Sequence, residues 1–93
     1  MLSHAQQEVI KSVTKKLRPT LLGVFGSYAR NEASVDSDLD LLIDFEQRVN
    51  LIDLIGIEQE LSKSLGIKVD LVTKRSVHSA LAPYIEADLI RLI

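Results

Sequence analysis

The sequence contains no cysteine and no tryptophan, and only two of its 93 residues are proline. Without cysteine the chain can form neither a disulfide framework nor a thiolate metal site. No apolar run approaches the roughly 20 residues that span a bilayer, and the N-terminal segment has no apolar core of the kind that signal peptides carry. These absences favour a protein of the cytoplasm that makes no contact with a membrane.

An excess of positive charge is also missing. Lysine and arginine number 11 against 13 aspartates and glutamates, which gives a formal net charge of −2. A general nucleic-acid binder normally carries a clear basic surface, so no direct binding to nucleic acid is expected. The apolar fraction of 46% is high enough for a real core, and a chain of this length has room for a single small domain. We therefore expect one domain, residues 1–93, and any large partner must bring its own surface.

Along the chain, short apolar runs typical of strands alternate with segments whose apolar residues have helical spacing. Three apolar runs are short enough to be strands: 21–25, 39–45 and 67–73. Segments with helical spacing surround them: 3–17, 50–66 and 76–93, with a short helical piece at 28–31. Such alternation predicts an α/β fold with a small sheet covered by helices.

Local signals predict where these helices begin and end. Ser3 followed by Gln6 forms a capping box, and the first helix is expected to stop at Arg18, because a residue before proline avoids helical geometry. Asn50 is expected to cap the second long helix, and Gly66 to end it. Glu58 falls within the apolar stripe of that helix, so we expect it either to pair with a basic residue or to lie where the stripe reaches the surface.

The last segment is predicted to be helical, capped at Ser76 and interrupted at Pro83. Its apolar residues then share one side at helical spacing: Ile85, Leu89, Leu92 and Ile93. This apolar surface must either fold back on the sheet or contact another protein. The sequence alone leaves both alternatives open.

The first candidate site feature is Gly26-Ser27, which follows an apolar strand and precedes a helical turn. Glycine lets the backbone approach a ligand closely, and the first amides of a helical turn point outward without partners, which suits a phosphate group. Taken alone, however, a Gly-Ser pair after a strand is most often an ordinary turn. Neither of the standard glycine-rich nucleotide motifs is present.

The second feature is Asp38-Leu39-Asp40 at the start of the 39–45 strand. Side chains two residues apart on a strand project from the same face, so the two carboxylates repel unless a cation lies between them. Oxygen-only ligands of this kind suit Mg²⁺ or Mn²⁺. The alternative is a solvated strand end in which Asp36 and Asp38 are ordinary polar loop residues.

The third feature is Asp70, which lies inside the apolar run Val69-Asp70-Leu71-Val72. An aspartate in such a run needs a partner if it is buried. A salt bridge to Lys68, Lys74 or an arginine would supply one. If its strand lies beside the 39–45 strand, the three carboxylates instead meet and form a two-metal site for phosphoryl chemistry.

Taken together, these residues resemble the DNA polymerase beta-like nucleotidyltransferases. The pattern Gly26-Ser27-Tyr28-Ala29-Arg30, then five residues after Asn31, then Ser37-Asp38-Leu39-Asp40-Leu41, matches that family's motif in spacing, and 69–72 resembles the strand with the third carboxylate. Asn31 stands where the family usually has glycine, and asparagine tolerates a left-handed backbone better than most residues. In length the chain is similar to the minimal nucleotidyltransferases (MNT).

The resemblance implies a role for each matched residue. The expected fold is the small mixed sheet of the polymerase beta palm. Gly26 and Ser27 would hold the triphosphate of ATP, and Arg30 would either reach phosphate or, as we prefer, brace the loop. Asp38 and Asp40 would bridge two divalent ions, Mg²⁺ or alternatively Mn²⁺, and Asp70 would bind the catalytic ion and help to activate an acceptor hydroxyl.

The resemblance further implies an adenylyltransferase that acts as an antitoxin, transferring AMP from ATP to a tyrosine of a cognate HEPN-domain toxin. Two alternatives remain at this point. The protein could neutralise its partner by binding alone, although nothing structural would then require three carboxylates. It could also modify a small-molecule hydroxyl, in which case formation of a homo-oligomer would have to complete the acceptor pocket.

Overall fold

A mixed sheet lies at the centre of the molecule. The structure, a computed structural model, describes residues 2–93, and within them the sheet has the strand order β3-β2-β1-β4. The strands are β1 Pro19–Phe25, β2 Leu39–Phe45, β3 Val69–Thr73 and β4 Ile90–Arg91. β2 runs antiparallel to β1 and parallel to β3, and β4 runs antiparallel to β1. The expected small mixed sheet is therefore confirmed, with one more strand than the sequence predicts.

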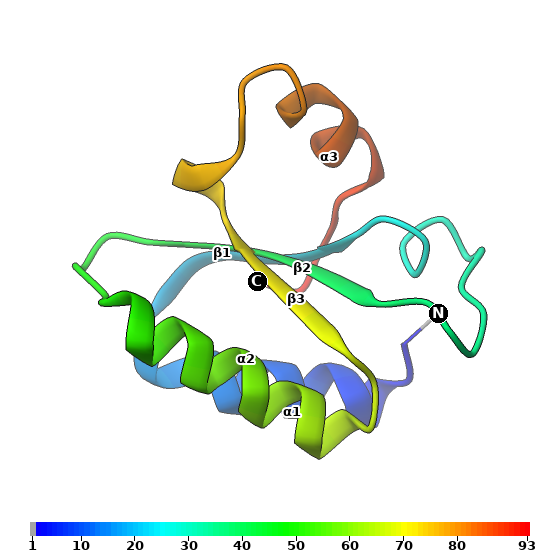
Figure 1. The fold of residues 1–93 in the computed structure, drawn as a ribbon, viewed down its shortest axis with the longest axis horizontal. Coiled ribbons are helices and arrows are strands. Elements are labelled where there is room, and N and C mark those ends of the chain that lie inside the picture. Colours follow the sequence, from blue (N-terminus) through cyan, green and yellow to red (C-terminus); the bar gives the residue numbers. More distant parts are fainter. Residues whose placement is uncertain (1) are drawn as a thin grey trace.

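The helices cover the two faces of this sheet unequally. The α-helices are α1 His4–Thr14, α2 Leu51–Leu65 and α3 Ala82–Asp88, and two single 3₁₀ turns, η1 Lys15–Leu17 and η2 Lys74–Ser76, follow α1 and β3. The two longer helices lie side by side under one face, and the short α3 stands over the other (Figure 1). None of the helices within residues 2–93 combines the length and the hydropathy needed to cross a lipid bilayer.

The caps predicted at Ser3 and Asn50 and the stop at Gly66 form as expected, but the cap predicted at Ser76 is wrong. Ser76 Oγ donates to the Thr73 carbonyl at 2.8 Å instead, and α3 begins only after Leu81. Ser3 Oγ accepts from the Gln6 amide at 3.1 Å, and Gln6 Oε1 accepts from the Ser3 amide at 2.8 Å. Asn50 Oδ1 accepts from the Asp53 amide at 2.8 Å, and Gly66 ends α2 with φ +67. These caps satisfy amides at the helix starts that have no partner within the helix.

The end of the first helical segment differs slightly from the prediction. α1 stops at Thr14 and continues as the 3₁₀ turn η1 to Leu17. Arg18 then has φ 51 and ψ 59, which is left-handed backbone. The residue before Pro19 thus leaves helical geometry as expected, and its left-handed turn lets β1 begin at once.

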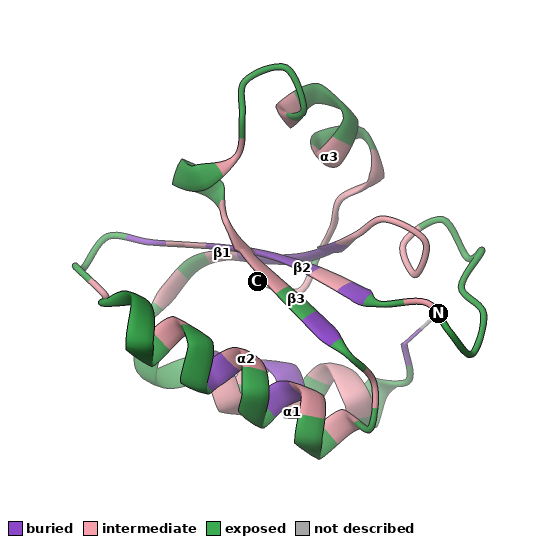
Figure 2. Cartoon of the chain, viewed as in Figure 1, coloured by how far each residue is buried: buried purple, intermediate pink, exposed green. Residues whose placement is uncertain are grey.

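The hydrophobic core lies between the sheet and the α1/α2 layer. It takes its side chains from both helices and from alternate residues of the strands (Figure 2). The buried members of this cluster are Leu2, Ile10, Leu17, Leu22, Val24, Leu39, Leu41, Ile43, Phe45, Ile57, Leu61 and Val69. Burial of this apolar layer fixes which face of each strand is turned away from the helices.

The prediction of a helix up to the C-terminus is wrong. α3 ends at Asp88, and the next residues form β4 against β1. Leu92 N–H donates to the Leu22 carbonyl at 2.7 Å, so strand pairing satisfies this backbone. Gly23 permits the close approach, because a Cβ there would lie 2.6 Å from Leu89 Cδ1. The tail therefore folds back on the sheet, and the idea that it forms a helical docking surface is dropped.

Candidate active site

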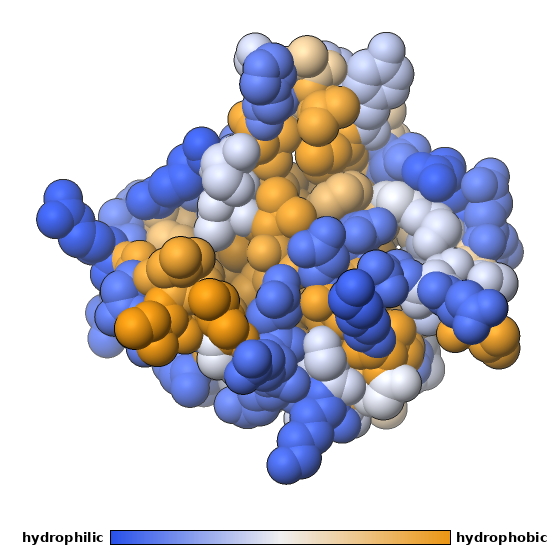
Figure 3. Space-filling view, viewed as in Figure 1, coloured by the Kyte–Doolittle hydropathy of each residue, from blue (hydrophilic) through white to orange (hydrophobic). Residues whose placement is uncertain are grey.

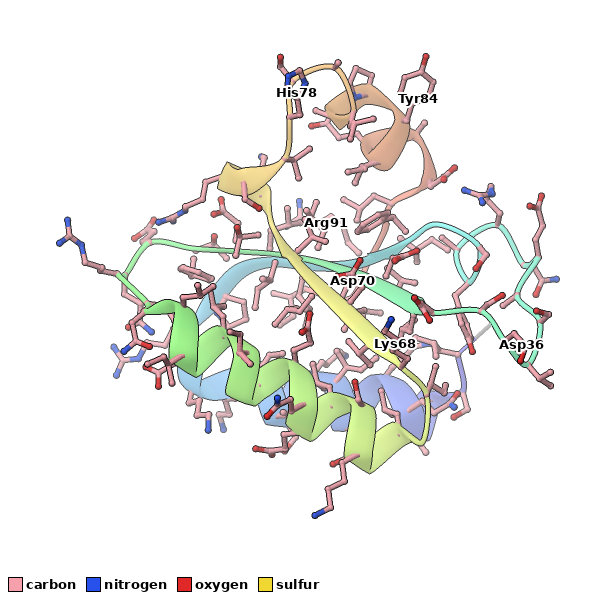
Figure 4. The ribbon with its side chains drawn as sticks, viewed as in Figure 1. Asp36, Lys68, Asp70, His78, Tyr84 and Arg91 are labelled. Atoms are coloured by element: carbon pink, nitrogen blue, oxygen red, sulfur yellow. The ribbon has the colours of Figure 1, made fainter. Side chains whose placement is uncertain are left out.

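The sheet brings Asp40 and Asp70 next to each other. Asp40 lies in β2 and Asp70 in β3, and the two are direct partners in the parallel ladder. Paired residues of neighbouring strands project from the same face of a sheet. Since Leu39, Leu41 and Val69 belong to the core under the sheet, both aspartates point to the opposite face. Figure 4 shows Asp70 on the part of β3 that crosses in front of β2.

Gly26 closes the site from the side of β1. β1 ends at Phe25, whose ladder partner is Asp40, so the next residue turns directly beside that carboxylate. Gly26 has φ +74, and a Cβ built there would overlap Asp40 Oδ2. Only glycine therefore fits this position without moving the aspartate. Asp38 lies just before β2, and the predicted motif residues are thus gathered around one end of the strand.

The motif loop forms a compact turn. Gly26 carbonyl accepts from the Arg30 amide at 3.0 Å, and Ser27 carbonyl accepts from the Glu32 amide at 2.9 Å. In a helical turn the carbonyls point forward and the first amides point back, where the turn itself offers them no acceptor. Asn31 has φ 59, so asparagine takes the left-handed geometry predicted for it. The short helical piece expected at 28–31 is this turn.

The electrostatics of the site centre on Asp40. Its partial burial raises the pKa of the carboxyl group above the ordinary value of 3.8, and the neighbouring charges of Asp70 and then Asp38 raise it further. Arg30 acts in the opposite direction and lowers this pKa. Asp38 lies 3.7 Å from Lys68 Nζ in an exposed ion pair. The charges of Asp70 and Asp38 therefore act on Asp40, and a cation beside Asp40 would relieve this repulsion.

Arg30 makes contacts of the kind that bracing of the loop requires, and its role toward phosphate stays a prediction. Its Nη1 lies 2.5 Å from Asp88 Oδ2 and its Nε 3.3 Å from Glu32 Oε2. The hydrogen bond to Asp88, followed by that to Glu32, raises the pKa of the guanidinium. Asp88 ends α3, so this contact ties the motif loop to the element over the open face of the sheet.

The donor set fits divalent Mg²⁺ or Mn²⁺ in its chemistry. Carboxylate oxygens are the ligands these ions prefer, and Asp40 carries the repulsion that an ion would offset. Among residues 2–93, no three acidic or histidine side chains are already gathered tightly enough to enclose an ion. Asp36 stays on the exposed loop away from Asp70 (Figure 4). The roles of Asp38, Asp40 and Asp70 as metal ligands remain predictions.

Two contacts near the site were not foreseen from the sequence. Glu58 is half-buried, as expected if the stripe reaches the surface there, and it accepts from the backbone amide of Leu71 at 2.7 Å. The alternative of a basic partner is therefore wrong. Ser62 Oγ accepts from the Val69 amide at 2.9 Å. The sequence did signal Glu58, because it is a glutamate inside an apolar helical stripe. The pattern could not reveal that the side chain accepts from a backbone amide at the edge of a strand.

Comparison with known proteins defines the class. The sequence profile of the nucleotidyltransferase domain matches residues 7–92. The protein adenylyltransferase MntA of Thermococcus cleftensis is 42% identical over 80 residues, which cover 82% of this chain and 81% of that protein. The chain therefore belongs to the nucleotidyltransferase domain family.

Solved structures share the same fold. A crystal structure of a toxin–antitoxin complex with AMP-PNP matches with a TM-score of 0.85 at 24% identity, over 94% of this chain and 72% of that one. The complex of a tri-AMPylated Shewanella oneidensis HEPN toxin with its MNT antitoxin matches with a TM-score of 0.80 at 21% identity, over 99% of this chain and 72% of that one. At these identities the likeness establishes the fold.

Proposed function

We propose that this chain is a magnesium-dependent protein adenylyltransferase that transfers AMP from ATP to a hydroxyl group of a partner protein. The observation that carries the proposal is the pairing of Asp40 with Asp70 on adjacent strands, with Gly26 turned against Asp40. The similarity to MntA of Thermococcus cleftensis, a protein adenylyltransferase, supports the choice of reaction.

In the proposed reaction the acceptor hydroxyl oxygen attacks the α-phosphate of ATP in line. A new P–O bond forms, the bond from the α-phosphorus to the bridging oxygen breaks, and pyrophosphate leaves. When bound, Mg²⁺ would supply charge neutralisation for the phosphates. The amides and hydroxyl of the Gly26-Ser27 turn would hold the triphosphate. Asp38 and Asp40 would hold the metal, and Asp70 would face the acceptor hydroxyl and promote loss of its proton.

The partner proposed is a HEPN-domain toxin, and the acceptor a tyrosine. This step is supported by the fold match to an MNT antitoxin bound to an AMPylated HEPN toxin. Addition of AMP would block the toxin, which makes the chain an antitoxin. Because ATP is made and kept inside cells, the reaction is assigned to the cytoplasm. Self-association stays a prediction that light scattering can check, as does the expected lack of nucleic-acid binding.

The test is a transfer assay with the purified chain, ATP, Mg²⁺ and the cognate partner. Intact-mass spectrometry should show the partner gaining AMP units while pyrophosphate is released. Asp70→Asn should suppress transfer more strongly than it weakens ATP binding measured by calorimetry. A gain of a single phosphate group instead of AMP would contradict the reaction class. Neutralisation of the partner with no mass change would indicate inhibition by binding alone.

A further inference from the structure

The strand that carries Asp70 lies at the edge of the sheet, with β2 on one side only. Leu39 N–H donates to the Lys68 carbonyl at 2.8 Å, so Lys68 faces β2. Peptide groups of successive strand residues point to opposite sides. Asp70 therefore also faces β2 through its backbone, and the amides of Val69 and Leu71 point to the free edge.

α2 supplies an acceptor for each of these two outward amides. Ser62 Oγ accepts from Val69 N–H at 2.9 Å, and Glu58 Oε2 accepts from Leu71 N–H at 2.7 Å. Four residues advance about 6 Å along a helix, and two residues advance about 6.6 Å along a strand. The spacing of Glu58 and Ser62 along α2 thus matches that of the Leu71 and Val69 amides along β3, which runs antiparallel to this helix.

The two helix side chains form a connected unit. Ser62 Oγ also donates to the Glu58 carbonyl at 3.0 Å, which orients its remaining lone pairs for Val69. Glu58 is half-buried on the side of α2 that faces β3. A hydrogen bond to an ionised carboxylate is shorter and stronger than one between neutral groups. The edge of β3 is therefore held on both sides of Asp70 by groups from α2.

The surroundings of Glu58 make this acceptor unusual for its position. A hollow beside it is lined mainly by apolar residues, with two polar ones at β3 and η2: Leu51, Leu54, Ile55, Leu71, Thr73 and Ser76. Figure 3 shows apolar residues gathered over the first half of α2, where Leu51 and Ile55 are exposed. A half-buried carboxylate among mainly apolar side chains requires a polar partner, and the Leu71 amide donates a hydrogen bond to it.

We propose that Glu58 and Ser62 are positioning residues for Asp70. By holding the free edge of β3 they fix the Asp70 carboxylate at the level of Asp40, so that both reach the same ligand. Reactive groups must be held within roughly 0.5 Å of their productive place, which an unsupported five-residue edge strand does not ensure. The inference rests on the proposed function, because that function gives the placement of Asp70 its importance.

The experiment compares Glu58→Ala with Glu58→Gln, whose amide oxygen can still accept from Leu71. Glu60→Ala is the matched control, since Glu60 is exposed on the same helix. Three quantities are measured: hydrogen exchange of the Val69 and Leu71 amides by NMR, affinity for Mn²⁺ by calorimetry, and kcat and KM for ATP in AMP transfer. Ser62→Ala is carried through the same measurements and decides the question if Glu58→Ala fails to fold.

In Glu58→Ala we expect Leu71 exchange to accelerate at least tenfold, and kcat and Mn²⁺ affinity to fall about tenfold, the loss typical of groups that orient metal ligands. KM for ATP should stay within about twofold. Glu58→Gln should restore most of both losses, and Glu60→Ala should match the wild type. Wild-type exchange, Mn²⁺ affinity and kcat in Glu58→Ala would overturn the proposal, as would a Gln variant that protects Leu71 yet stays as inactive as Ala. If the wild type transfers no AMP, the proposed function fails, while Leu71 exchange and Mn²⁺ affinity still decide the positioning role.

Discussion

The two faces of the sheet differ in what they bury. Under β2, the alternate residues Leu39, Leu41 and Ile43 are fully buried against α1 and α2. Over β2, Asp40 and Asp44 are partly exposed, and Leu42 between them is buried. The cover on this side is α3, which has no buried residue of its own. One face is closed by the core, and the other remains open at the end where the carboxylates lie.

This difference separates stability from chemistry within single strands. Because successive strand residues point to opposite faces, a residue of the core is followed directly by a residue of the site. The closed face can tolerate no charge, since a buried unpaired carboxylate is strongly unfavourable. The open face can hold repelling carboxylates because solvent or a cation stabilises them. Mutations of the two faces should therefore have separable effects.

The largest effect should follow from neutralising the open face at the site. We expect Asp38→Asn combined with Asp40→Asn to reduce AMP transfer by at least about a thousandfold, because the metal-bound triphosphate loses its ligands. The melting temperature should be unchanged or higher. Intact-mass spectrometry and a melting curve measure both quantities. Asp36→Asn, on the exposed loop, is the control and should retain transfer; loss of transfer in this control would show that the whole loop is required.

Truncation on the closed face should have the reverse effect. Leu61 is fully buried in the core, so Leu61→Ala should lower the free energy of unfolding by about 2–5 kcal/mol. Transfer per folded molecule should be retained at low temperature. Leu89→Ala, over the open face, should lower the free energy of unfolding less. Chemical denaturation measures both, and equal losses would show that the two faces contribute alike to stability.

A smaller effect concerns the pH dependence of stability without metal. The pKa of Asp40 is raised in the folded chain, so the folded state binds its proton more tightly than the unfolded state, whose value is near 3.8. This contribution to stability is complete below pH 3.8 and is lost as the pH rises through the folded pKa. Asp40→Asn should thus raise the melting temperature at pH 7 by roughly 2–5 °C.

The advantage of Asp40→Asn over the wild type should disappear as the pH falls below 3.8. Melting curves from about pH 3 to about pH 8, with a chelator present, measure this difference in melting temperature on both sides of the pKa of Asp40. A stabilisation of the variant that does not depend on pH would mean that repulsion at Asp40 is not its cause.

The smallest effect should follow from breaking the link between the motif loop and α3. Asp88→Asn removes the charged partner of Arg30 Nη1. Exposed ion pairs contribute little to stability, so the melting temperature should change by less than about 2 °C. If Arg30 braces the loop, KM for ATP should rise about two- to threefold because the turn at Gly26 is less well ordered. Steady-state kinetics measure this, and a fall in KM would mean instead that the freed Arg30 reaches phosphate.

Local sequence signals predicted much of the fold and the candidate site. The 39–45 strand, the caps at Ser3 and Asn50, and the stop at Gly66 all depend on contacts between residues close in the chain, which a pattern can report. The C-terminal segment was predicted wrongly because its apolar spacing also suits a helix. Pairing with β1 decides its conformation, and Gly23, far away in the chain, makes room for it.

The sequence by itself determined which residues are the candidates for the chemistry and which form the core. Glycine is required where the chain turns beside a carboxylate, and the alternation of apolar and acidic residues assigns each to one face of a strand. The tertiary structure alone decided that Asp40 and Asp70 are ladder partners, that Glu58 and Ser62 hold the edge beside Asp70, and that Arg30 is anchored to Asp88. Each of these contacts joins residues from different segments of the chain, so local periodicity cannot predict it. The contact depends on how the packing of the layers places one element against another.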